Sequence, residues 1–357
     1  MLTRREILDW LRENDPARIA ELWRLADDTR RRGVGDDVHL RGLIEISNHC
    51  ERQCAYCGIR AGRRDLERYR MTAAEILVAA RLAETLGYGT VVLQAGEDPG
   101  LTPAFVADLL RRLKGDTSLA VTLSLGERDD AEFALWREAG ADRYLLRFET
   151  ANRELYDRIH PPLGGRSSDR LAQLRRLREL GYEVGSGVMV GIPGQTWDDL
   201  AADIVLFAGL DLDMIGVGPY LPHPDTPLGG ATAVAAAPGG AQVPGDEATT
   251  LRVIALARLV CPWANIPSTT ALATINRDRG REHGLERGAN VVMPNLTPER
   301  YRVCYEIYPG KACLHETPEA CAGCLRLRIE GLGRRIGSGP GHARDHRAAA
   351  AVRAREV

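Results

Sequence analysis

The stretch LIEISNHCERQCAYC, residues 43–57, joins a short β-rich run to a loop that holds three of the chain's eight cysteines. The run is mostly apolar and β-rich, as a buried strand is, and the polar loop follows its carboxyl end directly. Cys50, Cys54 and Cys57 have the spacing Cys-x3-Cys-x2-Cys, with Tyr56 immediately before the last thiol. Clustered thiols in an intracellular chain are more often metal ligands than disulfide partners. The stretch therefore predicts a strand that carries a metal site at its end.

Seven further β-rich runs follow along the chain, and helical stretches separate them. Eight strands alternating with helices predict a closed parallel sheet, a complete (β/α)8 TIM-type barrel, rather than an open sheet. Polar residues follow every run, where the βα loops of a barrel meet at one mouth. The eight runs cover residues 43–47, 90–95, 119–124, 143–149, 183–190, 213–219, 265–270 and 289–294.

The rest of the chain predicts extensions at both ends of this barrel. Apolar residues at helical spacing predict helix over residues 4–33. We expect an N-terminal helical extension over 1–39, the barrel over 40–300, and a C-terminal segment over 301–357 that packs on the barrel. Residues 229–248 are low in complexity and predict a surface excursion, and the Arg- and Ala-rich end of the chain is assigned no function.

Composition restricts the kind of partner. The chain has 357 residues and a formal net charge of −2, which gives no reason to expect nucleic acid or a membrane surface. No run approaches the roughly 20 apolar residues that a membrane span needs. The charged, amphipathic start lacks the apolar core of a signal peptide. We expect a cytoplasmic protein.

The three clustered thiols favour an iron–sulfur cluster with one open iron. A structural zinc site takes four protein ligands, and His49 is the alternative fourth ligand beside Cys50. A 4Fe-4S cluster normally takes four thiolates, so three leave one iron free to bind another molecule. Such an iron can bind the amino and carboxylate groups of S-adenosylmethionine (SAM). A reduced cluster can then break the C–S bond and release a 5′-deoxyadenosyl radical.

The Cys-x3-Cys-x2-Cys spacing with Tyr56 resembles the signature of the radical SAM superfamily. The resemblance implies that Tyr56 packs near the adenine and that the turn at Gly96 and Glu97 approaches the methionine amino group. It also implies that Glu149 accepts a hydrogen bond from the ammonium of the cofactor and that Arg170 holds its carboxylate as a fork. The cofactor-binding residues expected on this basis are Tyr56, Gly96, Glu97, Ser124, Glu149, Arg170 and Ile192.

Longer motifs resemble the HydE family of FeFe-hydrogenase maturases. They include VVLQAGEDP (91–99), ADRYLLRFETAN (141–152) and DMIGVGPYLPHPDTPL (213–228), and they extend from about residue 40 to residue 330. Ala95 is a departure, because the family motif has Ser there. The resemblance implies a radical SAM enzyme that helps to assemble the diiron subcluster of the hydrogenase. It also implies a cysteine-bound iron carbonyl cyanide substrate, other maturases as partners, and an electron donor.

Some inward positions suit an anionic organometallic substrate. Arg147 precedes Glu149 by two residues on one strand, so both side chains face the same side. An inward cation is costly unless it meets an anion, and the alternative is an internal salt bridge with Glu127 or Glu149. We expect Arg147 to be catalytic together with the three cysteines. The expected substrate-binding residues are Gln94, Thr122, Arg147, Thr269 and Thr270.

A second cysteine group, Cys313, Cys321 and Cys324, follows the last strand run. Three thiols in twelve residues predict a metal site. The family resemblance implies a second iron–sulfur cluster, of 2Fe-2S or 4Fe-4S type. A Cys3His zinc site completed by His315 is the alternative from chemistry alone. Two other cysteines, Cys261 and Cys304, stand alone and are expected to be small core residues.

Two other functions are alternatives. One is a mutase like methylornithine synthase, which shares the RYRMT-like and GEDP elements but leaves the second cysteine group unexplained. The other is a non-catalytic iron–sulfur carrier or scaffold, which would bind iron and yield no 5′-deoxyadenosine from SAM.

Overall fold

The computed structural model describes residues 2–165, 168–230 and 242–343, and its centre is a parallel sheet. The low-complexity residues 231–241 and the end of the tail, 344–357, lie outside the described residues, so the interpretations given to them are not tested. The strands are β1 (Asp37–Ser47), β2 (Thr90–Ala95), β3 (Ala120–Ser124), β4 (Arg143–Leu145), β5 (Glu183–Val190), β6 (Met214–Pro219), β7 (Val291–Val292) and β8 (Arg335–Ile336).

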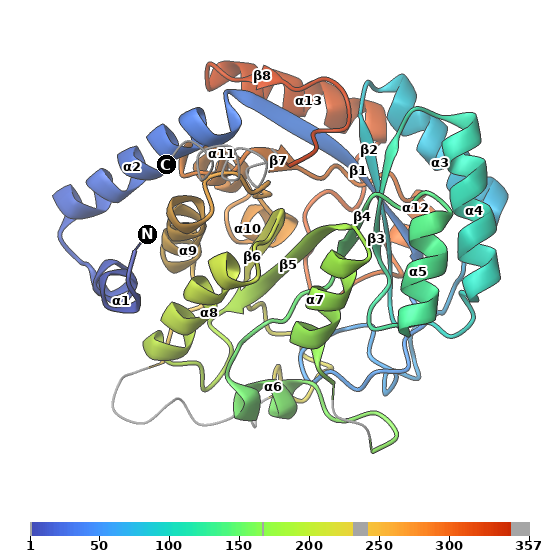
Figure 1. Ribbon diagram of the computed structural model, residues 1–357, viewed down its shortest axis with the longest axis horizontal. Coiled ribbons are helices and arrows are strands. Elements are labelled where there is room, and N and C mark those ends of the chain that lie inside the picture. The colour runs from blue at the N-terminus through green and yellow to red at the C-terminus, as the bar shows by residue number, and fades with distance from the viewer. Residues whose placement is uncertain (1, 166–167, 231–241, 344–357) are drawn as a thin grey trace, which may run out of the picture.

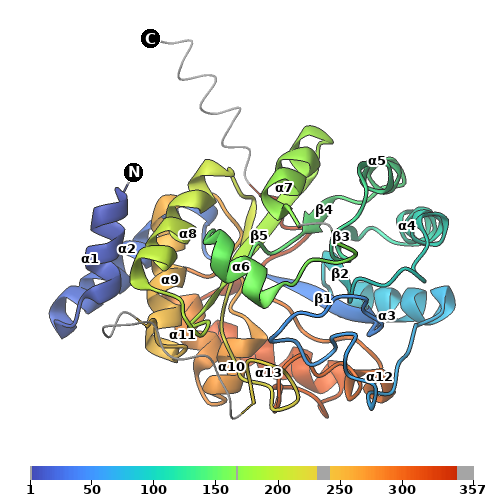
Figure 2. The ribbon, with the colours of Figure 1, turned by 90° about the horizontal axis from the view of Figure 1, so that it is seen from below.

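The sheet curves as part of a barrel, with the strand order β6-β5-β4-β3-β2-β1-β7. Every ladder between named strands is parallel, as βαβ connections require. Helices lie on the outside of the curved sheet (Figures 1 and 2). Parallel strands place all their carboxyl ends at one edge, so the loops that follow them gather there.

The complete eight-stranded barrel predicted from the sequence is not present, because one expected strand is not regular. Residues 265–270 make only isolated bridges, from Asn265 to Met214 and from Pro267 to Val291. Pro267 has no N–H to donate to a ladder. Thr269 then caps helix α10 by accepting a hydrogen bond from the backbone N–H of Leu272. Residues 265–270 therefore form a turn and a helix cap instead of a regular strand. Seven strands form the main path, and β8 pairs with β1 beside it.

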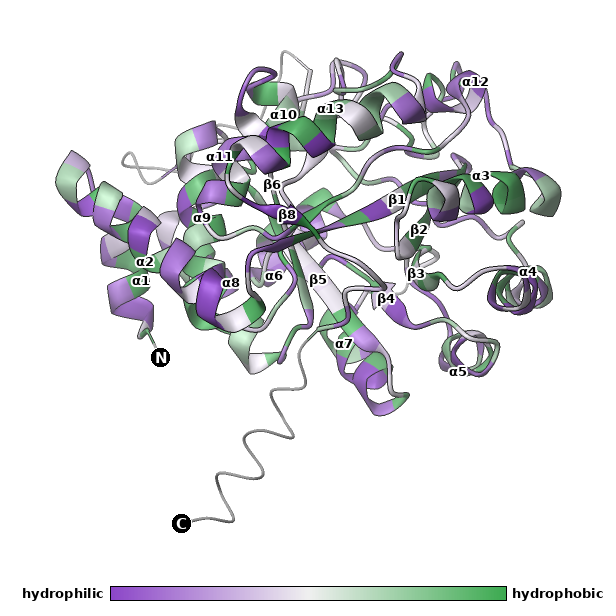
Figure 3. Cartoon of the chain, turned by 90° about the horizontal axis from the view of Figure 1, so that it is seen from above, coloured by the Kyte–Doolittle hydropathy of each residue, from purple (hydrophilic) through white to green (hydrophobic). Residues whose placement is uncertain are grey.

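Most helices fill the connections between strands. Figure 3 shows hydrophobic and hydrophilic residues mixed along outer helices such as α4, α5 and α8, as expected where one face is buried. The helices are α1 (Arg4–Arg12), α2 (Pro16–Val34), α3 (Ala73–Thr85), α4 (Pro103–Asp116), α5 (Asp130–Glu138), α6 (Arg153–Ile159), α7 (Arg170–Glu179), α8 (Trp197–Gly209), α9 (Glu247–Val260), α10 (Thr270–Ile275), α11 (Gly280–Glu286), α12 (Glu299–Arg302) and α13 (Pro318–Gly331).

The N-terminal extension is two helices where the sequence predicted one over residues 4–33. Asp15 caps the second helix and Pro16 begins it, because proline suits the first turn and disrupts a helix interior. Helix α1 packs on α8 and α9, and α2 packs on α9. Among the described residues, no helix is both long and apolar enough to cross a bilayer.

The C-terminal segment that follows β8 closes the amino end of the sheet. Arg41 donates from Nη2 to the carbonyl of Gly341 at 3.0 Å. Arg143 and the Thr90 hydroxyl both donate to the carbonyl of Pro340, at 2.9 and 2.8 Å. Both arginine side chains are fully buried. Because the C-terminal segment fills this end of the sheet, the opposite end, where the polar loops gather, is the open end.

Candidate functional site

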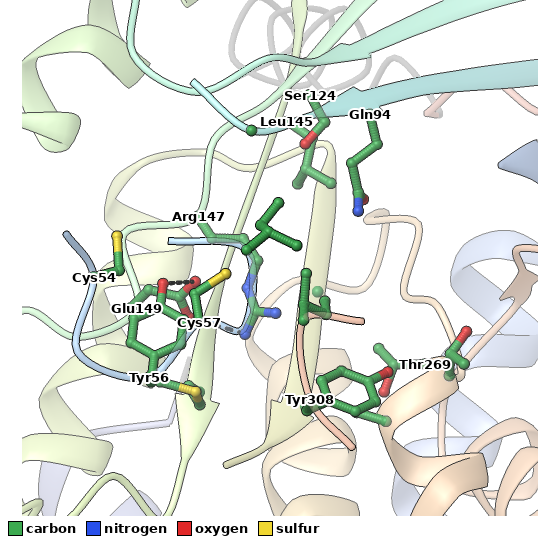
Figure 4. Close-up of a pocket in the computed structure, with 18 of the residues that line it drawn as sticks. Cys54, Tyr56, Cys57, Gln94, Ser124, Leu145, Arg147, Glu149, Thr269 and Tyr308 are labelled. Atoms are coloured by element: carbon green, nitrogen blue, oxygen red, sulfur yellow. Dashed lines mark hydrogen bonds and ion pairs between the residues drawn. The ribbon is translucent and has the colours of Figure 1, made fainter. Parts of the chain in front are cut away.

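A cavity of about 320 Å³ lies at the carboxyl end of the sheet. The three clustered thiols line one part of its wall, and residues of the C-terminal segment line another. Figure 4 shows Cys54, Tyr56 and Cys57 together on one side and Thr269 and Tyr308 on the other. The structure thus brings most of the residues predicted from sequence to a single cavity.

The thiol-bearing loop is held by backbone contacts to distant segments. The N–H of Ala55 donates to the carbonyl of Ile159 at 2.8 Å, and that of Gly58 donates to the carbonyl of Ile307 at 2.9 Å. Burial raises the pKa of Cys57 to about 12, so the thiol is protonated in the free protein. A thiol becomes a ligand only when a metal displaces its proton, which a positively charged iron core does. Three half-buried, unpaired thiols facing one cavity fit a cluster bound from one side.

Gly96 allows the loop after β2 to lie directly against the thiol loop. A Cβ atom at this position would meet the carbonyl oxygen of His49 at 2.3 Å and the Cβ of Cys50 at 2.7 Å. Both distances are far below van der Waals contact, so only glycine fits. This close approach brings the next residue, Glu97, beside the thiol loop, where its carbonyl accepts a hydrogen bond from the N–H of Glu51 at 2.9 Å.

Two arginines and two glutamates form a buried network beside the thiol loop. Arg170 donates from Nε to Glu127 at 2.9 Å and lies 3.4 Å from Glu97. Arg52, which stands between the first two cysteines, pairs with Glu97 and also lies 3.0 Å from Glu127. Arg170 donates from Nη1 to the carbonyl of Arg147 at 2.7 Å as well. Sequence reasoning missed Arg52, although its place inside the cysteine motif was a signal.

Tyr56 is fixed through its hydroxyl. The hydroxyl lies 2.9 Å from Nε2 of His160 and 3.5 Å from Oε1 of Glu149. Burial lowers the pKa of His160 far below its usual range, so its ring is neutral. The Tyr56 ring also packs against a small apolar cluster that contains Ile192. Ile192 itself is fully buried and does not line the cavity, but it belongs to the same apolar cluster as the lining residues Met189 and Tyr220.

Arg147 and Glu149 form an ion pair at the cavity wall. The Nη2 atom of Arg147 lies 3.0 Å from Oε2 of Glu149, so the internal salt bridge weighed as an alternative is present. The arginine side chain remains 33% exposed and lines the cavity, and its Nε has no partner among the described residues. Glu149 has φ 63°, a left-handed conformation that is uncommon for a residue with a side chain.

The polar residues predicted for the substrate side do not all reach the cavity. Gln94, Thr269 and Thr270 line it, as does Ser124. Gln94 donates to the hydroxyl of Tyr305 at 3.3 Å. Thr122 is fully buried outside the lining, and its hydroxyl has no hydrogen-bond partner in the described part of the chain. It lies one inward position below Ser124 on β3, too deep in the sheet to reach the cavity.

A buried ion pair at the cavity wall was missed from the sequence. Lys311 pairs with Glu45, and both side chains are almost fully buried. The Nδ2 group of Asn295 donates to the same carboxylate at 3.0 Å. Tyr305 and Tyr308, from the segment just before Lys311, also line the cavity. The YPGK motif carried a signal, but nothing in it indicated that the lysine turns inward.

The second cysteine group surrounds a smaller cavity of about 110 Å³. Cys313, Cys321 and Cys324 all line it. A hydrogen bond from the Cys321 thiol, together with the charge of Arg281, lowers the pKa of Cys313. Of the isolated cysteines, Cys261 is a buried core residue as predicted, whereas Cys304 is only partly buried and packs at the edge of the core.

Comparison with known proteins agrees with this geometry. The family model of the radical SAM superfamily matches residues 44–207, which include the end of β1, the thiol loop and the strands β2 to β5. A solved structure of methylornithine synthase (PylB) has the same fold, with a TM-score of 0.77 at 24% identity over 94% of each chain. Residues 44–207 therefore form a radical SAM domain.

Sequence relatives narrow the family further. The [FeFe] hydrogenase maturase subunit HydE of Thermotoga maritima is 47% identical over 335 residues, which is 94% of this chain and 92% of that protein. The 3-methylornithine synthase of Methanosarcina acetivorans is 28% identical over 283 residues, 78% of this chain and 75% of that protein. The chain belongs to the HydE family of radical SAM maturases.

Proposed function

We propose that this chain cleaves SAM reductively and uses the radical in assembling the diiron subcluster of FeFe-hydrogenase. Its substrate in this proposal is a cysteine-bound iron carbonyl cyanide complex. The observation that carries the proposal is that the three clustered thiols and the cation of Arg147 line one cavity. Membership of the HydE family supports the same reaction class.

The protein's part in SAM cleavage is to bind and orient the cofactor. Cys50, Cys54 and Cys57 would hold a 4Fe-4S cluster, which when bound and reduced would supply the electron for cleavage of SAM to methionine and a 5′-deoxyadenosyl radical. Glu149 would accept a hydrogen bond from the cofactor ammonium, and the buried Arg170 would attract its carboxylate. Tyr56, held by His160, would pack against the adenine.

The substrate-facing wall suits an anion with polar ligands. Arg147 would attract the net negative charge of an iron cyanide complex. Gln94, Thr269 and Thr270 offer amide and hydroxyl groups on the same cavity. Apolar residues such as Met214 and Met293 line part of the remaining wall, and surroundings of low polarity strengthen each polar contact. The protein would thereby hold the substrate close to the cofactor and away from water.

We also propose a second iron–sulfur cluster at the group Cys313, Cys321 and Cys324. Other hydrogenase maturases and an electron donor are the proposed partners. Residues 1–39, 40–300 and 301–357 are the proposed divisions of the chain into extension, barrel-like core and C-terminal segment.

The test is anaerobic reconstitution followed by SAM, dithionite and a synthetic cysteine-bound iron carbonyl cyanide complex. We expect 5′-deoxyadenosine together with consumption of the iron complex. SAM cleavage that leaves the complex untouched would overturn the proposed substrate. Lysine in place of the complex tests the mutase alternative, for which rearranged methylornithine is the expected product. A carrier would bind iron and release no 5′-deoxyadenosine.

Substitution of single cysteines tests the separate roles of the two groups. Cys54→Ala is expected to abolish SAM cleavage, while Cys321→Ala is expected to retain it. Equal loss in both variants would contradict two sites with different roles.

A further inference from the structure

We propose that the carboxylate of Glu316 is the fourth protein ligand of the second metal site, beside Cys313, Cys321 and Cys324. The inference rests on the proposed second iron–sulfur cluster and specifies its ligands. Neither the cysteine spacing nor the family resemblance pointed to this residue.

Three of the four proposed donor atoms lie close to one another. The Sγ atoms of Cys313 and Cys321 and a carboxylate oxygen of Glu316 all lie within 4.8 Å of one another. Cys324 lines the same cavity and follows Cys321 by three residues on helix α13, so both thiols lie on one helix face. Three thiols and one carboxylate therefore surround a single space.

The loop that carries two of these donors is held in place by a buried arginine. Arg302 donates from Nη1 to the carbonyls of Cys313 at 3.0 Å and Glu316 at 2.7 Å. Thr317 then caps α13 by accepting a hydrogen bond from the N–H of Ala320. These contacts fix the backbone of Glu316 relative to both cysteines. A ligand on a fixed backbone loses less conformational freedom on binding than one on a free loop.

The cavity also contains a cation, Arg281, that forms no salt bridge with an acidic side chain in the described part of the chain. Arg281 is only 6% exposed and donates from Nη2 to the Sγ of Cys313 at 3.4 Å. Its Nη1 is buried with no hydrogen-bond partner among the described residues. A buried guanidinium needs a negative charge nearby. Three thiolates and a carboxylate around iron provide that charge, which a neutral occupant would not.

His315, the other candidate fourth ligand, is directed elsewhere. Its side chain is 75% exposed, and Nδ1 lies 3.3 Å from Oε1 of Glu299. It lines a different groove, with residues of helix α3, rather than the cavity of the cysteines. The neighbouring residue Glu316 borders both this groove and the cysteine cavity, whereas His315 borders only the groove. The Cys3His site considered from the sequence therefore lacks its histidine in this structure.

A carboxylate ligand changes how the site should behave. A carboxylate oxygen is a harder donor than a thiolate sulfur. Iron that is bound to sulfur ligands therefore holds the oxygen less firmly than it would hold another thiolate. The iron beside Glu316 should therefore be the first to be lost. Replacement of Glu316 by cysteine should tighten the site, because it supplies the softer ligand.

The experiment isolates the second site in the full chain. The variant Cys50→Ala/Cys54→Ala/Cys57→Ala leaves only the second group to hold a cluster. Glu316→Gln, Glu316→Cys, His315→Ala and Glu319→Gln are then added singly, and each protein is reconstituted with iron and sulfide without oxygen. Glu319 is an exposed carboxylate in the first turn of helix α13, which carries Cys321 and Cys324, and it serves as the matched control. Bound iron, zinc and sulfide, visible absorption, and the electron paramagnetic resonance spectrum after reduction are measured.

We expect Glu316→Gln to lose iron to a chelator about tenfold faster or more. Glu316→Cys should retain iron with a shifted absorption spectrum, and the other two variants should match the background. A Glu316→Gln protein with unchanged iron, spectrum and loss rate would overturn the carboxylate ligand while the second cluster still stands. No iron in the background variant, or zinc in its place, would overturn the second cluster and this inference with it.

Discussion

The Nη2 atom of Arg147 lies 3.0 Å from the Oε2 atom of Glu149, across the boundary between the two proposed halves of the cavity. Glu149 is the proposed acceptor for the cofactor ammonium, and Arg147 is the proposed cation for an anionic substrate. A cation bound at Glu149 competes for the charge that now holds Arg147. Binding of the cofactor should therefore leave Arg147 more available to the substrate, and the coupling is reciprocal.

Arg147→Gln should weaken substrate binding much more than SAM cleavage. A hydrogen bond to a charged group contributes about 1.5–3 kcal/mol, so the substrate affinity should fall roughly 10- to 100-fold. The measurement is the concentration dependence of iron-complex consumption beside the yield of 5′-deoxyadenosine. Arg111→Gln, on the exposed surface of α4, is the control for loss of an arginine. Equal loss of both activities would place Arg147 on the cofactor side instead.

Gly96→Ala should prevent correct assembly of the first cluster. Its Cβ would overlap the carbonyl of His49 and the Cβ of Cys50, both parts of the thiol loop that cannot rotate away. The iron content per chain after reconstitution should fall by the amount that the first cluster contributes, and SAM cleavage should be lost. Gly115→Ala is the matched control, since nothing lies within 4 Å of its added Cβ. That helical substitution should stabilise the protein by up to about 1 kcal/mol. Full iron content in Gly96→Ala would contradict the close approach.

Sequence reasoning predicted the thiol site more accurately than the sheet. The spacing of Cys50, Cys54 and Cys57 is local, so the backbone alone brings the thiols to one loop. Closure of a barrel depends on whether a short run such as 265–270 pairs with two neighbours. There, Pro267 and the capping Thr269 decide against a regular strand, and a β-rich composition does not reveal that.

Sequence reasoning also missed contacts between residues that are far apart along the chain. Lys311 and Glu45 are 266 positions apart, and only the folded chain brings them together. Arg147 and Glu149 do line the same cavity, as predicted, but β4 ends at Leu145, so the period of two along a strand is not what places them there. Thr122 was expected to bind substrate, but the sequence could not give its depth in the sheet, which depends on how the strands are staggered.

Lys311→Met should destabilise the protein strongly, and Glu45→Gln added to it should restore much of the loss. Both side chains are almost fully buried, so removal of one leaves an uncompensated charge at a cost of about 3–5 kcal/mol. The double variant has no buried charge left at the pair and should lie closer to the wild type. The free energy of unfolding from denaturant titration of all four proteins gives the coupling directly. Additive losses would show that the two residues act independently.

Asp203 on helix α8 should make the stability of the protein depend on pH. The carboxylate accepts hydrogen bonds from the N–H of Ala151 at 2.5 Å and from Nε2 of Gln195 at 3.5 Å, so it joins the loops that follow β4 and β5. Burial raises the pKa of Asp203 from 3.8 to about 8. Between these values the folded chain binds a proton that the unfolded chain has released. The contribution of Asp203 to stability is therefore fully present below pH 4 and is lost as the pH rises towards 8.

Asp203→Asn removes this titration, so its stability relative to the wild type should increase with pH. Each pH unit inside the window changes the difference by at most about 1.4 kcal/mol, which gives roughly 2–4 kcal/mol between pH 5 and pH 8. Denaturant titrations of both proteins at these two pH values measure the difference, and Asp108→Asn, on the exposed surface of α4, is the control. Loss of the hydrogen bonds to Ala151 and Gln195 should lower the stability of Asp203→Asn at both pH values. The test compares the two pH values with each other, so this common loss does not hide the pH-dependent change. A difference that stays constant with pH would mean that Asp203 is ionised in the folded protein throughout, with its charge stabilised by the surrounding donors.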